Sequence, residues 1–220
     1  ENWRATVSSF KTETAEGFHY IRVKPGLLDL FVMQGVITFF IAPLGVLLPF
    51  FVEDTLHSTP KWYGFLMAGL AFGVTLGSVV STVIKIAPAK KGKLGGSALI
   101  LYSLCLIGVG YSQTVVTALL VLMVMGVCSG LMYVLVNSVI QRSTPGEIRG
   151  RVFGLLTTAT FALTPISMGL AGIVADLVNH DITLIYTGCG ICTLIATLML
   201  LLREGLHQLL SGDDYSVNSV

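Results

Sequence analysis

Residues 94–141 read "LGGSALILYSLCLIGVGYSQTVVTALLVLMVMGVCSGLMYVLVNSVIQ", a run of 48 residues without Asp, Glu, Lys or Arg. A single helix of that length would be about 72 Å long at about 1.5 Å per residue, more than twice the hydrocarbon thickness of a bilayer. The run must therefore turn back, and "GVGYSQT" at 108–114 is the polar, glycine-containing break near its middle. We expect two membrane-spanning helices, over 94–111 and 114–140.

Shorter charge-free runs lie on both sides of this stretch, at 30–52, 62–84, 152–175 and 182–202. Each has close to the roughly 20 residues that a helix needs to cross a bilayer. Barrel strands are a poor alternative, because they are about 10 residues long and alternate apolar with polar side chains. The sequence predicts an all-α membrane protein with an amphipathic linker at 1–26, six transmembrane helices within 27–203 and a tail at 204–220, the other spans being 28–52, 62–84, 151–176 and 182–203.

The composition agrees with a lipid environment. Hydrophobic residues make up 54% of the 220 residues and charged residues 11%, and the mean hydropathy is +0.83. Soluble domains carry about 25% charged residues, because water must wet their surface. The net charge of +1 argues against a nucleic-acid partner. The chain begins at Glu1 without the pattern of a signal peptide, and we expect it to be a piece of a longer protein.

The basic residues predict the orientation. With six spans both termini lie on one side, and if that side is cytoplasmic, 12 of the 13 Lys and Arg residues fall inside and only Lys61 lies outside. Cytoplasmic loops carry such an excess of positive charge. We therefore expect a multi-pass protein of the cell membrane with both termini of this segment in the cytoplasm. The polar stretch "QRSTPGEIRGRVFG" at 141–154 is then a cytoplasmic loop.

Small residues four apart recur within the expected spans and predict close contacts between helices in lipid. They are Gly69, Gly73 and Gly77, then Gly126 and Gly130, and Gly150 and Gly154.

Three prolines lie within expected spans, at Pro43, Pro49 and Pro165. Each removes a backbone donor, which a membrane helix tolerates where a neighbouring helix or a cavity satisfies the freed carbonyl.

Polar and bulky side chains inside the spans are candidates for the lining of a substrate cavity. Gln34 and Thr38 are four residues apart and share a helix face. Ordinary packing remains the alternative for the bulky residues, as does hydrogen bonding to the preceding helical turn for threonines. The candidate lining residues are Gln34, Thr38, Phe39, Phe72, Met132, Tyr133, Asn137 and Phe161.

Enzymatic and metal chemistry find little support. Cys189 and Cys192 form a C-x-x-C pair, but no expected span contains a His, so a metal site lacks ligands. "GVCSG" at 126–130 is similar to the serine motif of rhomboid proteases, and the base that would activate its serine is missing. We expect no enzyme activity, metal or cofactor.

Three stretches carry a resemblance to a known family: "EGFHYIRVKPGL" (16–27), "NSVIQRSTPGEIRGRVFGLL" (137–156) and "MGLAGIVAD" (168–176). The chain resembles the C-terminal half of a major facilitator superfamily transporter, in the branch of the macrolide-efflux proteins and the enterobactin exporter. The resemblance implies two inverted three-helix repeats, 28–111 and 114–203. It also implies an inner-gate role for the loop residues Arg142, Glu147, Arg149 and Arg151, with plain anchoring of the topology as the alternative.

One stretch departs from the family pattern. "GSVVSTVIKIAPAKKGK" at 77–93 stands where the superfamily has a Gly-x-x-x-Asp-Arg-x-Gly-Arg type of motif. Its lysines keep the positive charge but no Asp is present, which puts in doubt a charge lock that depends on that carboxylate.

The expected function is efflux of an amphipathic small molecule by alternating access, with proton antiport as the candidate driving force. The implied partners are the substrate, the bilayer and the N-terminal six-helix half, without nucleic acid. The alternatives are a lysophospholipid flippase and a non-transporting membrane scaffold. The charge-free runs contain no carboxylate for proton coupling, and the nearest acids, Asp29, Glu53 and Asp176, lie at span ends where we expect water to reach them.

Overall fold

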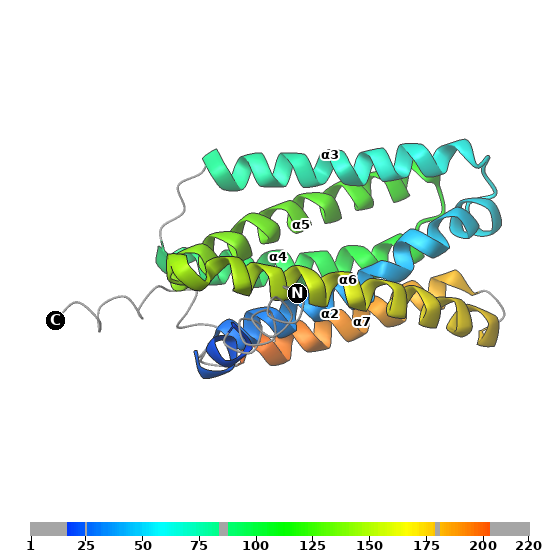
Figure 1. Cartoon of the computed structure of the whole chain (residues 1–220). Helices are drawn as coiled ribbons and strands as arrows, with labels where there is room; N and C mark the ends of the chain where they lie inside the picture. The colour runs from blue at the N-terminus through cyan, green and yellow to red at the C-terminus, as the bar shows by residue number, and fades with distance from the viewer. Residues whose placement is uncertain (1–16, 25, 84–87, 179–180, 203–220) are drawn as a thin grey trace, which may run out of the picture.

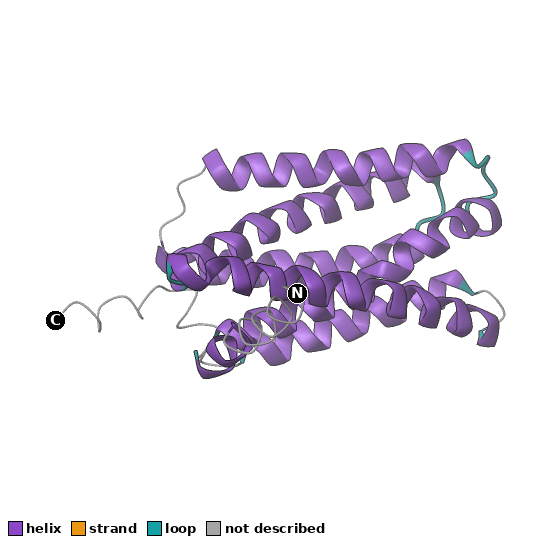
Figure 2. Cartoon of the chain, in the orientation of Figure 1, coloured by secondary structure: helices purple, strands orange, loops and turns teal. Residues whose placement is uncertain are grey.

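The computed structural model describes residues 17–24, 26–83, 88–178 and 181–202, with the backbone alone at 88–93. This part of the chain consists of helices and turns, without a strand (Figure 2). A short helix over 17–23 precedes α2 (Leu27–Phe50), which continues into the π-helical turn η1 (Phe51–Thr55). The other helices are α3 (Lys61–Val83), α4 (Pro88–Gly110), α5 (Val115–Ser143), α6 (Gly146–Leu177) and α7 (Ile182–Leu201).

The helix ends have local chemical causes. Between α4 and α5, the Thr114 side chain accepts a hydrogen bond from the backbone N–H of Thr117 at 3.2 Å, which satisfies a donor that the first turn leaves without an intrahelical partner. The Asp181 side chain does the same for the N–H of Leu184 at 3.1 Å at the start of α7. Between α5 and α6, Thr144 is extended and Pro145 precedes the first helical residue.

The long helices can be set beside the predicted spans. α2 with η1 covers 27–55, where the sequence predicts a span over 28–52, and the turn between α4 and α5 falls within 108–114. Among the described residues, five helices are long and apolar enough to cross a membrane, whereas α4 contributes only the shorter apolar segment Leu94–Gly110. The sixth crossing therefore stays a prediction. Residues 1–16 and 25 of the expected linker (1–26), the tail at 204–220, residues 84–87 and the side chains at 88–93 lie outside the described residues.

The helices pack in a symmetric sequence of contacts. α3 packs on α5, α5 on α4, α4 on α7, α7 on α2, and α2 on α6, and Figure 1 shows α3 and α7 on opposite sides of the bundle. Exchanging α2 with α5, α3 with α6 and α4 with α7 leaves this set of main contacts unchanged. Successive helices run in opposite directions along the bundle (Figure 1). Each set holds three helices, so the first helix of the second set, α5, runs opposite to the first helix of the first set, α2. This is the pattern that two inverted repeats would produce.

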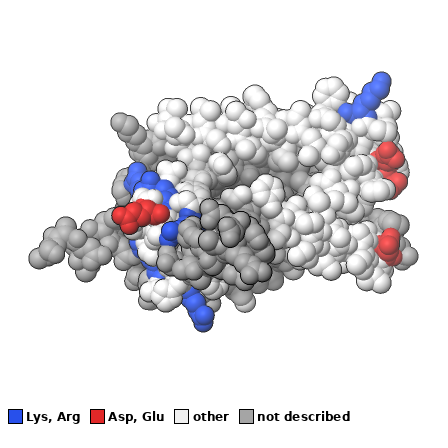
Figure 3. Space-filling view, viewed as in Figure 1, with Lys and Arg blue, Asp and Glu red and all other residues white. Residues whose placement is uncertain are grey.

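Charged side chains gather at the two ends of the bundle. Among the described residues, the middle of the face visible in Figure 3 shows no Lys, Arg, Asp or Glu, and most of the visible Lys and Arg lie at one end. The opposite end shows mainly Asp and Glu. A middle zone without charge is what a hydrocarbon layer requires, and the chain is a multi-pass membrane protein.

Candidate functional site: an apolar cavity between α2 and α6

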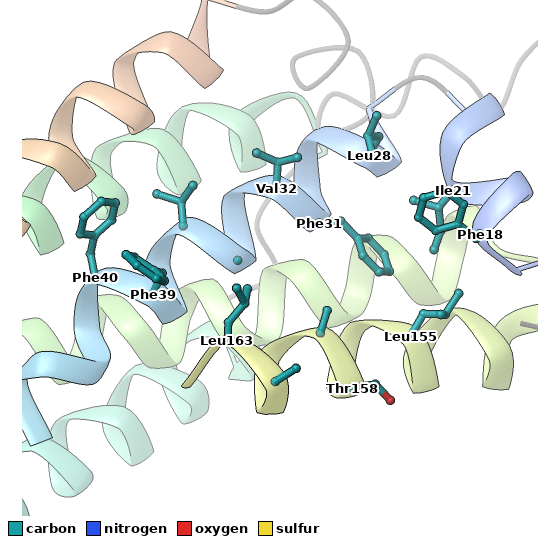
Figure 4. A pocket seen from close by; sticks show the side chains of 14 residues that line it. Phe18, Ile21, Leu28, Phe31, Val32, Phe39, Phe40, Leu155, Thr158 and Leu163 are labelled. Carbon is teal, nitrogen blue, oxygen red and sulfur yellow. The ribbon is translucent and has the colours of Figure 1, made fainter. Parts of the chain in front are cut away.

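A cavity of about 640 Å³ lies between α2, α6 and the short helix over 17–23. The α2 residues that line it recur every three or four positions, which places them on one face of the helix. Figure 4 shows Phe31 and Phe39 on α2 lying opposite Leu155 and Leu163 on α6, with Phe18 and Ile21 at one end. The full lining is Phe18, Ile21, Leu28, Phe31, Val32, Gly35, Val36, Phe39, Phe40, Leu155, Thr158, Ala159, Ala162 and Leu163.

The chemistry of the lining is almost entirely apolar. Among the described lining residues Thr158 alone has a polar side chain, and four of the others are phenylalanines. Such a wall offers van der Waals contact and aromatic faces to a ligand but no charge and no general acid or base. Its volume lies within the range of small-molecule sites. The cavity therefore suits the apolar part of an amphipathic molecule.

A hydrogen bond between α2 and α6 supports the backbone beside the cavity. Pro43 has no N–H, so the carbonyl of Phe39, four residues earlier, loses its intrahelical donor. The Ser167 hydroxyl of α6 donates a hydrogen bond to this carbonyl. The neighbouring helix thus satisfies the carbonyl that the proline frees.

Helices α3 and α5 pack through glycines with almost no space between their backbones. A Cβ added to Gly73 would collide with the Met123 carbonyl oxygen and lie 3.1 Å from the Gly126 Cα. A Cβ on Gly77 or Gly130 would likewise collide with a backbone carbonyl, of Val127 and Val74 respectively. Gly69 is close to the Leu119 side chain. The predicted packing glycines of these two helices thus lie in one continuous seam.

Gly150 and Gly154 behave differently from what their spacing predicts. A Cβ added to either would meet nothing within 4 Å. The prediction of a close contact at this pair is wrong for the described residues, because both glycines lie on a face of α6 that no other described helix covers.

The loop between α5 and α6 lies beside the short N-terminal helix. Tyr20 donates a hydrogen bond from its hydroxyl to the Ser143 carbonyl oxygen at 2.8 Å, and the Lys24 ammonium donates to the same oxygen. Sequence reasoning did not assign a role to Tyr20, Lys24 or Ser143. The sequence does show a cation, Lys24, of the kind that binds the C-terminal carbonyls of a helix. Only the fold shows that the helix is α5.

The predicted gate residues occupy different positions around this loop. Arg142 and Glu147 are exposed, and Arg151 is half-buried. Arg149 donates to the Thr144 carbonyl at 3.3 Å, so it bonds within its own loop. Their role in gating stays a prediction.

The eight candidate lining residues do not gather at one place. Phe39 lines the cavity, Thr38 beside it is buried and Gln34 half-buried. Asn137 donates to the carbonyl of Tyr133 one turn earlier at 2.7 Å. Met132 is buried in the core, whereas three of the others are on the outer surface of this chain: Phe72 (54% exposed), Tyr133 (65%) and Phe161 (73%). None of the described lining residues of the cavity comes from α3 or α5.

The acids near the span ends also differ from one another. Glu53 and Asp176 are exposed, whereas Asp29, in the first turn of α2, is only 8% exposed. The expectation that water reaches Asp29 is therefore wrong in this structure. Asp29 lies where the positive end of the helix dipole favours a carboxylate.

The chain is similar in sequence to known membrane proteins. The pattern of the transmembrane secretion effector family, within the major facilitator superfamily, matches residues 5–219. The chain is 26% identical over 193 residues to the multidrug efflux pump Tap of Mycobacterium tuberculosis, covering 86% of this chain and 45% of that protein. It is 25% identical over 162 residues to the Tap pump of Mycolicibacterium fortuitum, covering 73% and 39%. The chain thus spans less than half the length of these relatives, and no solved structure matches it.

Proposed function

Because this chain belongs to the transmembrane secretion effector family of the major facilitator superfamily, we propose that it forms half of an exporter of amphipathic small molecules. The observation that carries the proposal is the apolar cavity between α2 and α6. It forms one wall of the substrate path, and the N-terminal six-helix half supplies the opposite wall. Residues 1–220 expressed alone are then expected to give no export above background.

The apolar lining supports a division of labour between the two halves. The lining described here holds no ionisable side chain, so this half contacts the apolar part of the substrate. Charge recognition and the proton-coupled carboxylate belong to the other half, because a proton antiporter needs a group that changes protonation inside the membrane. Transport proceeds by alternating access in the cell membrane, with both termini of this segment in the cytoplasm.

The test measures accumulation of a lipophilic drug in cells that express the full-length protein. Gly35→Leu places a branched side chain in the cavity, where an alanine-sized Cβ already lies 3.4 Å from the Leu163 Cδ1. We expect drug export to fall about tenfold or more, because one extra or missing methylene in an apolar pocket already changes the preference for a substrate by about tenfold or more. Gly64→Leu is the matched control, because a Cβ at Gly64 meets nothing within 4 Å.

The same cells separate the alternatives. A flippase moves labelled lysophospholipid and leaves the drug inside, whereas a membrane scaffold moves neither. Either result contradicts drug export. Full export by Gly35→Leu at normal expression contradicts instead the proposal that this cavity forms a wall of the substrate path.

A further inference from the structure

The short helix over 17–23 and Lys24 together form a segment that we call the strap (17–24). It is joined to α2 through Gly26, whose φ of 80° lies in the left-handed region that glycine adopts without strain. This turn lets the strap leave the axis of α2. The strap then lies against the end of α5 at Ser143 and the first turns of α6 at Arg151 and Leu155.

The strap is held at one point by two donors. The Tyr20 hydroxyl and the Lys24 ammonium both donate to the Ser143 carbonyl oxygen. Ser143 is the last residue of α5, so its carbonyl has no intrahelical donor and carries part of the negative end of the helix dipole. A cation and a hydroxyl on one such oxygen form a strong and localised attachment.

The other side of the strap lines one end of the cavity. Phe18 and Ile21 are three residues apart, on one face of the strap helix, and both line the cavity between α2 and α6. A Cβ added to Gly17 would lie 3.0 Å from the Leu155 Cδ1 and 3.4 Å from the Arg151 Cβ. The strap therefore rests on α6 at the same end of the bundle at which it is attached to α5.

The attachment point contains a polar group without a partner. The Thr144 hydroxyl oxygen is buried and has no hydrogen-bond partner among the described residues, although its residue adjoins Ser143. A buried hydroxyl without a partner disfavours the arrangement in which it occurs.

We propose that the strap is a gate for the α2–α6 cavity, fastened by Tyr20 and Lys24 to the Ser143 carbonyl. Opening releases these two hydrogen bonds and withdraws Phe18 and Ile21 from the cavity end. The inference rests on the proposed function only in that the cavity conducts substrate. Access to the cavity can be measured without transport.

The first measurement is the labelling rate of Val36→Cys, a half-buried cavity position, in the otherwise cysteine-free full-length protein with a charged thiol reagent on both faces. We expect Tyr20→Phe with Lys24→Met to raise this rate about tenfold, since tenfold corresponds to about 1.4 kcal/mol and two hydrogen bonds are lost. Arg22→Met is the matched control, because Arg22 is an exposed cation on the same helix. Equal rates in the double variant and the control overturn the proposal.

The second measurement locks the strap. Cysteines at Gly17 and Arg151 would have Cβ atoms about 3.4 Å apart, close to the usual spacing in a disulfide. In the full-length protein, oxidation of Gly17→Cys/Arg151→Cys should abolish drug export and reduction should restore it to the level of Arg151→Cys alone. Each single variant should be insensitive to oxidant. Export that continues with the disulfide formed overturns the gate. If the double variant raises the labelling rate as expected but the protein exports no drug, the gate stands and the proposed function is overturned.

Discussion

The α3–α5 and α2–α6 pairs occupy equivalent places in the symmetric set of contacts, yet they pack in opposite ways. At α3–α5 the glycines bring backbone against backbone, so that even a methyl group has no room at Gly73. At α2–α6 phenylalanines and leucines hold the helices apart around a cavity of about 640 Å³. Small side chains make one pair a rigid contact, and large ones make its counterpart a site with space for a ligand.

The same difference appears in how each pair treats its backbone carbonyls. In α3–α5 the carbonyls of Met123 and Val127 face the glycines of the other helix. In α2–α6 one carbonyl, that of Phe39, is freed by Pro43 and bonded by Ser167. The tight pair depends on the absence of side chains, while the open pair depends on one specific hydroxyl.

The largest expected effect concerns the orientation of the two pairs. If the repeats are inverted, the α2–α3 and α5–α6 loops lie on opposite faces of the membrane. In a cysteine-free full-length protein, Thr59→Cys should react with an impermeant thiol reagent from outside and Gly146→Cys should not. Both positions are exposed, unlike Ser143, which is buried and would stay unreactive on either face. Reaction of both from the same side contradicts the inverted arrangement.

The next effect separates a glycine in the seam from one outside it. Gly73→Ala should lower the stability of the full-length protein by about 1–3 kcal/mol, because the methyl group forces two backbones apart. Gly64→Ala, on the same helix with open space around it, should raise stability by up to about 1 kcal/mol through helix propensity. Thermal unfolding in detergent measures both, and equal shifts would mean that the seam does not exist.

A smaller effect concerns the open pair. Ser167→Ala should destabilise the protein by about 0.6–1 kcal/mol, the size of one hydrogen bond inside a membrane protein. In a Pro43→Ala background the loss should shrink, because the substituted alanine supplies the N–H that the Phe39 carbonyl lacks. Thermal unfolding measures the stability of the wild type, the two single variants and the double variant. Equal losses of stability from Ser167→Ala in both backgrounds would show that Ser167 acts independently of Pro43.

The smallest effect is expected at the exposed acids. Glu53→Gln and Asp176→Asn should each leave substantial proton-driven drug export, because both side chains lie at the bundle ends and are exposed. Substrate-induced proton movement in vesicles with the full-length protein is the measurement. Loss of proton movement in either variant while substrate still binds would place the coupling group in this half.

The positions of helices and turns were within reach of sequence reasoning, because a bilayer imposes strong constraints on composition. A run such as 94–141 must be helical and must turn, and "GVGYSQT" is where polar and glycine residues permit it. The glycine repeat on α3 was visible for the same reason, since its spacing is local to one helix.

The cavity could not be read from the sequence, because its lining depends on how much space two helices leave between them. Phe39 was among the candidates and lines the cavity, whereas Phe72, Tyr133 and Phe161 carry the same local signals and are exposed outside it. Gly150 and Gly154 repeat the spacing of the seam and yet face open space. A spacing pattern states which residues share a face but not what lies opposite that face.

By itself, the sequence determined that this chain is helical, lies in lipid and carries its charge at the helix ends, because burying a charge in hydrocarbon costs too much to occur by chance. The tertiary structure alone decided that Ser167 meets the carbonyl freed by Pro43 and that Tyr20 and Lys24 meet Ser143. These partners are more than 100 residues apart. Such pairs form only when packing brings their helices together, and no local pattern encodes that distance.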